Sequence, residues 1–248
     1  MPLSVADALL PVVDGLMLPA LHRALLRPGE LVRAAGGDLH RLPRYFYEVE
    51  TWALALTTPL TPHFGLWEFM DVDLHERPPL RLFPRYVPCA VGVLAAALEG
   101  FRLDVGAPVR IAANGGYRSP SHSGSAAGSP HCWGTAADIY RIGSDLLDAP
   151  DRIERYAAAM RRALPCASIR PAAGEAGTVD DHLHVDLGYV TVTPELRLEV
   201  SPRLKAEWEN GREYYAYHGK ELRCRPEDVS NFPSSEFLQW HNENRFNG

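Results

Sequence analysis

Residues 128–140 have the sequence GSPHCWGTAADIY, a turn that leads into an apolar strand. Gly134 allows a tight backbone turn, and the small residues 135–137 allow the following strand to lie close to its neighbours. We therefore expect the turn to bring His131 and Asp138 to one point. Both residue types are zinc ligands, although a His and an Asp seven residues apart also occur often by chance.

A second group of ligand types follows in DDHLHVD, residues 180–186. Because side chains alternate along an extended strand, His182, His184 and Asp186 are predicted to share one face. The opposite face is apolar apart from Asp181. Such a strand suits the half-buried wall of a metal site, and the alternative is a polar strand face open to solvent. A catalytic zinc needs about three protein ligands and one open position, which the two groups together can supply.

The surrounding pattern predicts an α+β fold with a central antiparallel sheet flanked by helices. Short apolar strands are predicted at PVRIAAN (108–114), TAADIY (135–140) and HLHVDLGYV (182–190). Helices are predicted at PCAVGVLAAALEGF (88–101) and DAPDRIERYAAAMRRAL (148–164).

Composition narrows the classes of function. A chain of 248 residues with 46% hydrophobic content can bury one large core, with or without an appendage. The net charge of -6 and the scattered basic residues argue against a nucleic-acid surface. No run of 18 apolar residues occurs, so no membrane span is predicted. The four cysteines form no C-x-x-C pair, which argues against a zinc ribbon and leaves two disulfides open; they are Cys89, Cys132, Cys166 and Cys224.

The apolar N-terminal stretch from Leu3 to Leu26 is not typical of a signal peptide. Pro11, Asp14 and Pro19 interrupt it, and no basic residue precedes Arg23. A cytoplasmic location is the default expectation. Action on a cell wall would then need lysis or a non-classical export route.

The stretch SPHCWGTAAD fits the S-x-H-x-x-G-x-A-x-D signature of the zinc D-Ala-D-Ala carboxypeptidases and L-alanyl-D-glutamate endopeptidases, which are relatives of the hedgehog signalling domain. Upstream, GGYRSPSHSGSA resembles the G-Y-R-S-P-x-H-N segment of this family, with Ser123 in place of its Asn. HLHVDLG resembles the strand that carries the third metal ligand in this family. LTPHFGLWEF (60–69) resembles a short segment at the start of many bacterial members. The resemblance covers residues 60–190 approximately.

The resemblance implies a metallopeptidase that hydrolyses peptide bonds in D-amino-acid-containing peptidoglycan peptides. His131, Asp138 and His184 would hold one Zn²⁺ per chain, with a metal-bound water as the nucleophile. The family's general base stands three positions before the last ligand, where this chain has Asp181. A fully extended strand would turn Asp181 away from the face of His184, so this role needs a turn or bulge there, and His182 is the alternative base.

Further roles follow from the same resemblance. Arg118 would face the substrate carboxylate or the developing oxyanion, and the alternative is a surface arginine that stabilises a turn. Ser129 would hydrogen-bond the substrate backbone or tether the His131 loop, and Tyr117 is a further candidate for substrate binding. Asp186 would orient a ligand or satisfy local backbone. His122 is expected to make a structural polar contact, and Cys132 to pack in the interior.

Three parts of the chain are expected. Residues 1–58 form a helical N-terminal segment with Ser4 as an N-cap, a break at Gly36 and Gly37, and helical spacing in RYFYEVETWALAL (44–56). Residues 59–200 form the zinc peptidase domain. Residues 201–248 form a small αβ extension, with a strand pair around YYAYHGKELRC (214–224) and a helix that begins at Ser234 or Ser235.

Two alternative functions remain beside the peptidase. A non-catalytic zinc-containing binding protein of the same fold would keep the metal without turnover, as in the hedgehog branch. The C-terminal extension holds His218, His241 and Asn242, which resemble a fragment of a His-Asn-His metal nuclease but lack a second clear ligand around Tyr214. The simpler account is an aromatic module, with Trp240 and Phe246 in its core, that packs on the peptidase domain or binds an unidentified partner.

Overall fold

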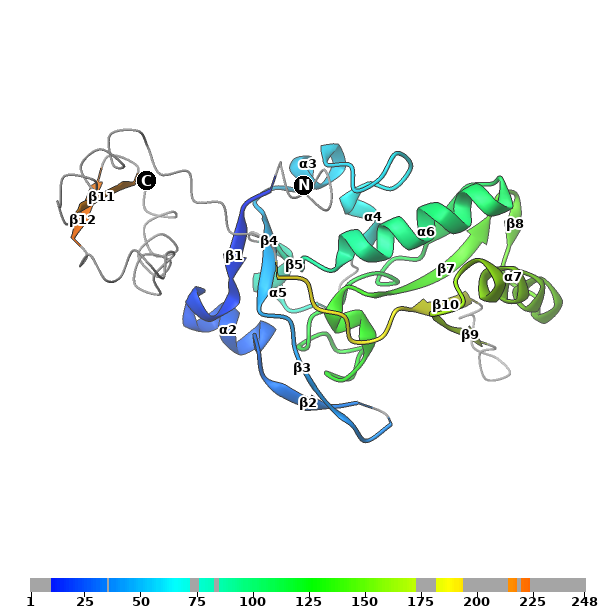
Figure 1. The fold of residues 1–248 in the computed structure, drawn as a ribbon, viewed down its shortest axis with the longest axis horizontal. Coiled ribbons are helices and arrows are strands. Elements are labelled where there is room, and N and C mark those ends of the chain that lie inside the picture. The colour runs from blue at the N-terminus through cyan, green and yellow to red at the C-terminus, as the bar shows by residue number, and fades with distance from the viewer. Residues whose placement is uncertain are drawn as a thin grey trace.

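A five-stranded antiparallel sheet forms the centre of the molecule (Figure 1). The computed structural model describes residues 10–34, 36–71, 76–82, 85–172, 182–193, 214–217 and 220–223. The strand order of the central sheet is β6-β7-β10-β9, and β8 pairs with the end of β7. Its strands are β6 (Val109–Ile111), β7 (Ala136–Ile142), β8 (Asp145–Leu146), β9 (Ser168–Ala172) and β10 (His182–Asp186). The expectation of an α+β fold with an antiparallel sheet is confirmed.

The pairing of β7 with β10 separates an apolar face from a polar one. Leu183 pairs with Ile139, and His184 pairs with Asp138. Since directly opposed residues of an antiparallel pair lie on the same face, the two aliphatic side chains share one face of the sheet. His184 and Asp138 share the other, as the alternation in the sequence predicts.

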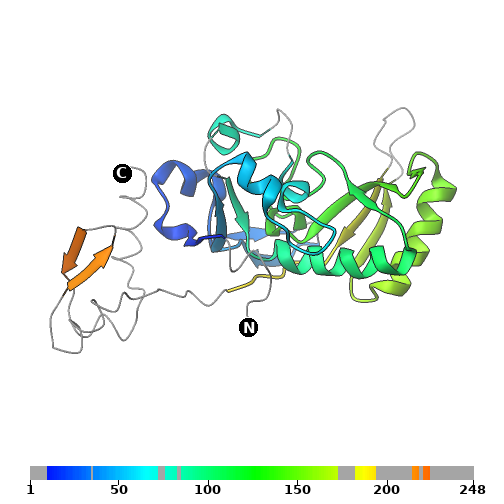
Figure 2. The same cartoon turned by 90° about the horizontal axis from the view of Figure 1, so that it is seen from above.

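Helices α6 (Val91–Val105) and α7 (Pro150–Ala163) pack beside the sheet and complete its core (Figure 2). Helix α6 ends at Gly106, which adopts a φ of 62° that favours glycine. Helix α7 begins with Pro150 at its first position, where no backbone N–H is needed. The helix residues buried with Ile139 and Leu183 include Leu94, Leu98 and Phe101 from α6 and Ile153, Ala157 and Met160 from α7.

A second, three-stranded antiparallel sheet has the order β1-β4-β5. Its strands are β1 (Val12–Asp14), β4 (Tyr45–Val49) and β5 (Arg85–Pro88). Tyr47 and Val49 of β4 belong to the same buried cluster as Val185 of β10. The described residues before position 58 therefore share a sheet and a core with those that follow.

The expectation of a helix throughout residues 44–56 is wrong. Tyr45–Val49 form strand β4, and helix α3 (Trp52–Thr57) begins only after Thr51, whose Oγ1 accepts the backbone N–H of Leu54 at 3.1 Å. Aromatic and β-branched side chains favour strands, and here pairing with β1 and β5 overrides the helical spacing. The N-terminal part is consequently mixed, with short helices between strands.

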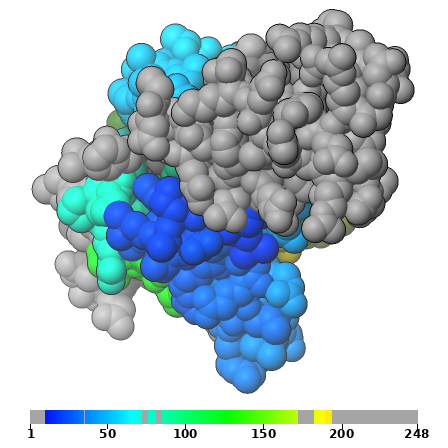
Figure 3. Space-filling model, turned by 90° about the vertical axis from the view of Figure 1, so that its left-hand side faces the viewer, coloured from blue at the N-terminus to red at the C-terminus, as the bar shows by residue number. Residues whose placement is uncertain are grey.

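A hairpin from the N-terminal part supports the turn that carries His131. Strands β2 (Leu31–Arg33) and β3 (Leu39–Arg41) are joined by a turn in which Gly37 has a φ of 93°, where the sequence predicts a break. The hairpin protrudes at the lower edge of Figures 1 and 3. Trp133, in the 3₁₀ helix η2 (Pro130–Trp133), donates its indole N–H to the carbonyl of Arg41 at 3.0 Å and meets Tyr189 edge-on at 4.9 Å between ring centroids.

The remaining elements are short. They are η1 (Gly15–Met17), α2 (Ala20–Leu26), α4 (Leu66–Met70), α5 (Pro78–Leu82), β11 (Tyr214–Tyr217) and β12 (Lys220–Arg223). The antiparallel pairing of β11 with β12 confirms the predicted strand pair. Ser4, Cys224 and the predicted helix that begins at Ser234 or Ser235 lie outside the described residues. Among the described helices, none has the length and apolar content needed to cross a membrane.

Trp133→Ala should lower the free energy of unfolding by about 3–5 kcal/mol, because it removes a fully buried indole and leaves a cavity. Urea denaturation followed by circular dichroism measures this. The matched control is Trp52→Ala in α3, where the side chain is 41% exposed and the expected loss is about 1 kcal/mol or less. Equal losses in the two variants would contradict the anchoring role of Trp133.

Candidate metal centre

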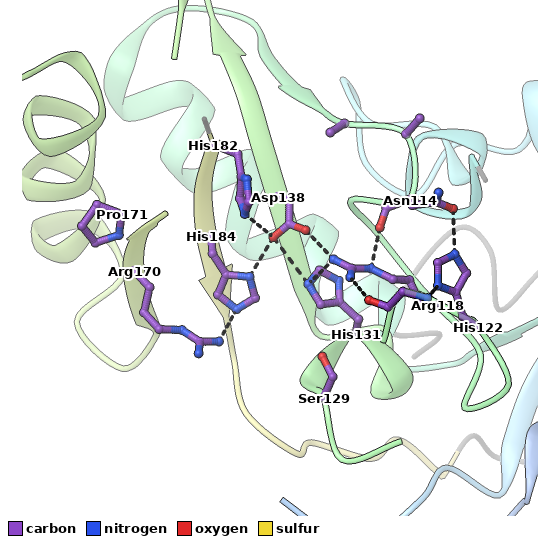
Figure 4. A pocket seen from close by; sticks show the side chains of 13 residues that line it. Asn114, Arg118, His122, Ser129, His131, Asp138, Arg170, Pro171, His182 and His184 are labelled. Carbon is purple, nitrogen blue, oxygen red and sulfur yellow. Dashed lines mark hydrogen bonds and ion pairs between the residues drawn. The ribbon is translucent and has the colours of Figure 1, made fainter. Parts of the chain in front are cut away.

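Three buried side chains from separate elements converge at one point (Figure 4). His131 comes from η2, Asp138 from β7 and His184 from β10. Asp138 Oδ1 lies 2.7 Å from His184 Nδ1 and 3.4 Å from His131 Nε2. The turn at Gly134, which has a φ of 69°, joins η2 to β7 and brings the first two residues together, as the sequence predicts.

This arrangement can hold a metal ion. One ligand atom from each of the three residues lies within 4.8 Å of the other two. A tetrahedral ion with bonds of about 2.0–2.1 Å requires ligand atoms about 3.3 Å apart. Asp138 Oδ1 and His131 Nε2 are close to that separation, whereas Asp138 Oδ1 and His184 Nδ1, at 2.7 Å, would have to move apart to admit the ion. Three protein ligands leave a fourth position for a water molecule or a substrate.

The backbone orients the first histidine. His131 Nδ1 donates to the carbonyl oxygen of Gly116 at 2.7 Å, which leaves Nε2 directed at Asp138. Gly116 packs so tightly that an added Cβ would lie 2.4 Å from the carbonyl oxygen of Phe69. The neighbouring Gly115 accepts the backbone N–H of Asp138 at 2.7 Å. The Gly-Gly pair therefore fixes both the strand and the ring of His131.

Arg118 forms a hydrogen bond with the second carboxylate oxygen of Asp138, Oδ2. Its Nη2 donates to Asp138 Oδ2 at 2.5 Å and lies 2.9 Å from His131 Nε2. Its Nε donates to the carbonyl of Asn114 at 2.6 Å. Because Oδ2 is held by the guanidinium, Oδ1 faces the two histidines.

Asp186 contacts the second histidine. Asp186 Oδ2 lies 3.1 Å from His184 Nε2, and Oδ1 accepts the backbone N–H of Gly188 at 3.1 Å. A histidine that binds a metal through one ring nitrogen usually donates the other N–H to such a carboxylate. Arg170 Nη2 also approaches His184 Nε2, at 2.7 Å, and Nδ1 on the other side of the ring faces Asp138 Oδ1.

The surroundings set the charge of the three groups. Burial acts to raise the pKa of Asp138, but hydrogen bonds to His131 and His184 outweigh it and hold that pKa well below its usual value. Burial lowers the pKa of His131. For His184, burial acts to lower the pKa, while the hydrogen bonds to Asp138 and Asp186 raise it overall. Asp138 is therefore an ionised carboxylate and His131 a neutral imidazole, which are the forms of these side chains that bind metals.

A cavity of about 710 Å³ opens above the three side chains. Ser129 and His182 line it, together with Arg118. Ser129 Oγ makes no hydrogen bond to any residue that the structure describes. His182 Nε2 lies 3.5 Å from Asp138 Oδ1, on the same face of β10 as His184. A molecule bound in the cavity would contact both residues.

Two neighbouring residues have structural roles, as the sequence predicts. His122 accepts the backbone N–H of Gly124 at its Nδ1 and pairs through Nε2 with Asn114 Oδ1 at 3.2 Å. Cys132 is buried beside Trp133, and burial raises its thiol pKa to about 12. Within the described residues, Cys89, Cys132 and Cys166 form no disulfide.

Some predicted residues lie elsewhere. Tyr117 is buried in the core, lines a different small cavity beside Tyr86, and is not among the residues that line the large one. Its predicted contact with substrate has no support in its position. Asp181 lies outside the described residues, as do the tail residues His218, His241 and Asn242.

Sequence reasoning missed two polar residues that line the cavity, Arg170 and Asn114. Arg170 on β9 pairs with His184 across the sheet, and Asn114 adopts a φ of 57° and fixes Arg118. The alternating pattern around Arg170 signals a strand, but only the register of β9 against β10 places that side chain beside His184.

Comparisons with protein-family models, with curated proteins and with solved structures gave no match.

Proposed function

We propose that this protein is a zinc-dependent metallopeptidase that hydrolyses peptide bonds in D-amino-acid-containing peptidoglycan peptides. The observation that carries the proposal is the convergence of His131, Asp138 and His184 at the floor of the large cavity. Each of the three side chains also has an outer partner that orients it. The signature around residues 129–138 supports the same reaction class through its resemblance to known zinc peptidases.

Zinc is the ion that this donor set fits best. Two imidazoles and one carboxylate with an open fourth position are typical of catalytic zinc sites. When bound, zinc would supply Lewis-acid polarisation of the scissile carbonyl and would lower the pKa of a water molecule towards about 7.

Arg118 has two roles in the proposed reaction. It holds Asp138 Oδ2 so that the ligand oxygen stays turned towards the histidines. Its fixed positive charge also stands at the cavity wall, where it can stabilise negative charge that develops on the substrate carbonyl oxygen.

A general base must accept a proton from the attacking water and return one to the leaving amine. The family resemblance assigns this role to Asp181. His182 is the alternative on the described part of β10, since its imidazole lines the cavity within 3.5 Å of Asp138 Oδ1.

Purified wild-type protein should contain about one zinc per chain, as a three-ligand site binds a single ion. His131→Ala and His184→Ala should each lower zinc affinity by more than about 100-fold. Removing a ligand weakens metal binding more than removing a residue that only orients a ligand. Elemental mass spectrometry after dialysis measures the content. His63→Ala, at a surface histidine paired with Glu99, is the matched control and should keep its zinc. A folded wild type that takes up no zinc would remove the mechanism.

Asp186→Asn should weaken zinc binding by about 10–100-fold, because the carboxylate that orients His184 becomes a neutral amide. Competition with a chromogenic chelator measures the affinity. Asp145→Asn changes an aspartate far from the cavity lining, paired with Tyr156, and should leave zinc affinity unchanged. Equal affinity in wild type and Asp186→Asn would rule out the orienting role.

Wild-type protein should cleave purified muropeptides, and mass spectrometry of the products identifies the bond. Asp181→Ala should lower kcat by about 10²–10⁴-fold with zinc content retained, because the proton acceptor is lost. Wild-type rates in Asp181→Ala together with a comparable loss in His182→Ala would transfer the role to His182. If the wild type holds stoichiometric zinc and cleaves no muropeptide, the protein is a non-catalytic zinc-containing binding protein.

A further inference from the structure

Two backbone carbonyls hold the guanidinium of Arg118 beside the candidate metal centre (Figure 4). Its Nε donates to the carbonyl oxygen of Asn114 at 2.6 Å, and its Nη1 donates to that of Gly124 at 3.4 Å. Both acceptors lie between β6 and η2, one on either side of Arg118 in the chain. The third nitrogen, Nη2, donates to Asp138 Oδ2 at 2.5 Å. The position of this guanidinium therefore depends on where the two carbonyls lie.

The side chain of His122 joins the two segments that carry these carbonyls. Its Nδ1 accepts the backbone N–H of Gly124 at 3.0 Å, and its Nε2 lies 3.2 Å from Asn114 Oδ1. Because a backbone N–H can only donate, Nδ1 carries no proton, and Nε2 donates to the amide oxygen of Asn114. Gly124 permits this close approach, since an added Cβ would lie 3.2 Å from His122 Cε1. His122 thus forms a bridge between the two acceptors of Arg118.

The bridge lies in the interior, and it meets Asn114 in an uncommon conformation. His122 is 5% exposed, so water competes little for its hydrogen bonds. Asn114 has a φ of 57°, in the left-handed region that asparagine adopts more readily than most residues. Its backbone N–H donates to the carbonyl of Asp71 at 2.7 Å. Hydrogen bonds at the backbone and at the side chain therefore keep Asn114 in the conformation in which its carbonyl meets Arg118.

We propose that His122 and Asn114 are positioning residues for Arg118. His122 fixes the two carbonyl acceptors relative to each other, and the acceptors fix the guanidinium beside Asp138 Oδ2. An arginine held in this way can stabilise developing negative charge without first being reoriented. The effect on turnover rests on the proposed function, whereas the effect on the position of the guanidinium does not.

Hydrogen exchange at the Nε–H of Arg118, followed by NMR, tests the position of the guanidinium directly. The full-length protein is labelled with ¹⁵N, and the Arg118 signal is identified by its absence from the spectrum of Arg118→Lys. His122→Ala and Asn114→Gly should each speed the exchange by about 10-fold or more, because a charge-assisted hydrogen bond is weakened.

Two of the substitutions separate the bridge from the backbone. Glycine adopts the left-handed conformation readily, so Asn114→Gly keeps the carbonyl and removes only the amide. His122→Gln should restore slow exchange in part, since its amide also offers one acceptor and a donor. Asn114→Gly keeps the test decisive if His122→Ala does not fold.

The same variants have a kinetic signature. At saturating zinc, His122→Ala should lower kcat for muropeptides by about 10–100-fold and leave KM nearly unchanged, because Arg118 acts on charge that develops only in the transition state. The double variant His122→Ala/Asn114→Gly should lose no more than the larger single loss, since both changes break one bridge.

His22→Ala is the matched control. His22 is a partly buried imidazole of α2 that meets Tyr86 edge-on at 5.1 Å between ring centroids. Neither of its ring nitrogens has a hydrogen-bond partner among the residues that the structure describes. Its removal should lower the free energy of unfolding and leave both kcat and the exchange at Arg118 unchanged.

Unchanged exchange at Arg118 in folded His122→Ala or Asn114→Gly would overturn the proposal. A wild-type signal that exchanges too fast to observe, or additive losses of kcat in the double variant, would do the same. If the wild type cleaves no muropeptide, the peptidase proposal fails, and the exchange rates alone decide the positioning role.

Discussion

The pairing of β7 with β10 is the constraint on which the rest of the structure depends. In this register Ile139 and Leu183 enter the core, while Asp138 and His184 lie on the cavity face. A slip of one residue would turn every side chain of β10 to the other face, so that aliphatic groups faced the cavity and His184 faced the helices. The free energy of burying the core therefore also selects the geometry of the candidate metal centre.

Asp138 shows how the fold keeps a carboxylate ionised in its interior. Burial of a charged group is costly unless hydrogen bonds compensate. Arg118 occupies one oxygen, and His131 and His184 approach the other. The partners come from three separate segments. Backbone carbonyls hold Arg118 and His131, and the side chain of Asp186 contacts His184. The site is thus assembled by side chains that the fold has already oriented.

Local patterns in the sequence predict most of the central sheet, and the family resemblance supplies the choice of His131, Asp138 and His184 as candidate ligands. Alternation predicts which face His182, His184 and Asp186 share, and the glycine turn predicts that His131 approaches Asp138. The features that the sequence did not predict depend on pairing with residues far away in the chain. Tyr45–Val49 become a strand because they pair with β5, about forty residues later, and helical spacing carries no information about that pairing. Arg170 reaches His184 only through the β9–β10 register, which no local motif specifies.

Asp138 and His184 are 46 residues apart in the chain, although their side chains are in contact. An unfolded chain must close a long loop to bring them together, and the entropy of that closure opposes a preformed ion site. In the native protein, strand pairing holds the loop closed. During synthesis the complete ligand set arises only after β10 has joined the sheet, so an ion that needs all three side chains selects folded molecules over nascent ones and adds its binding free energy to their stability.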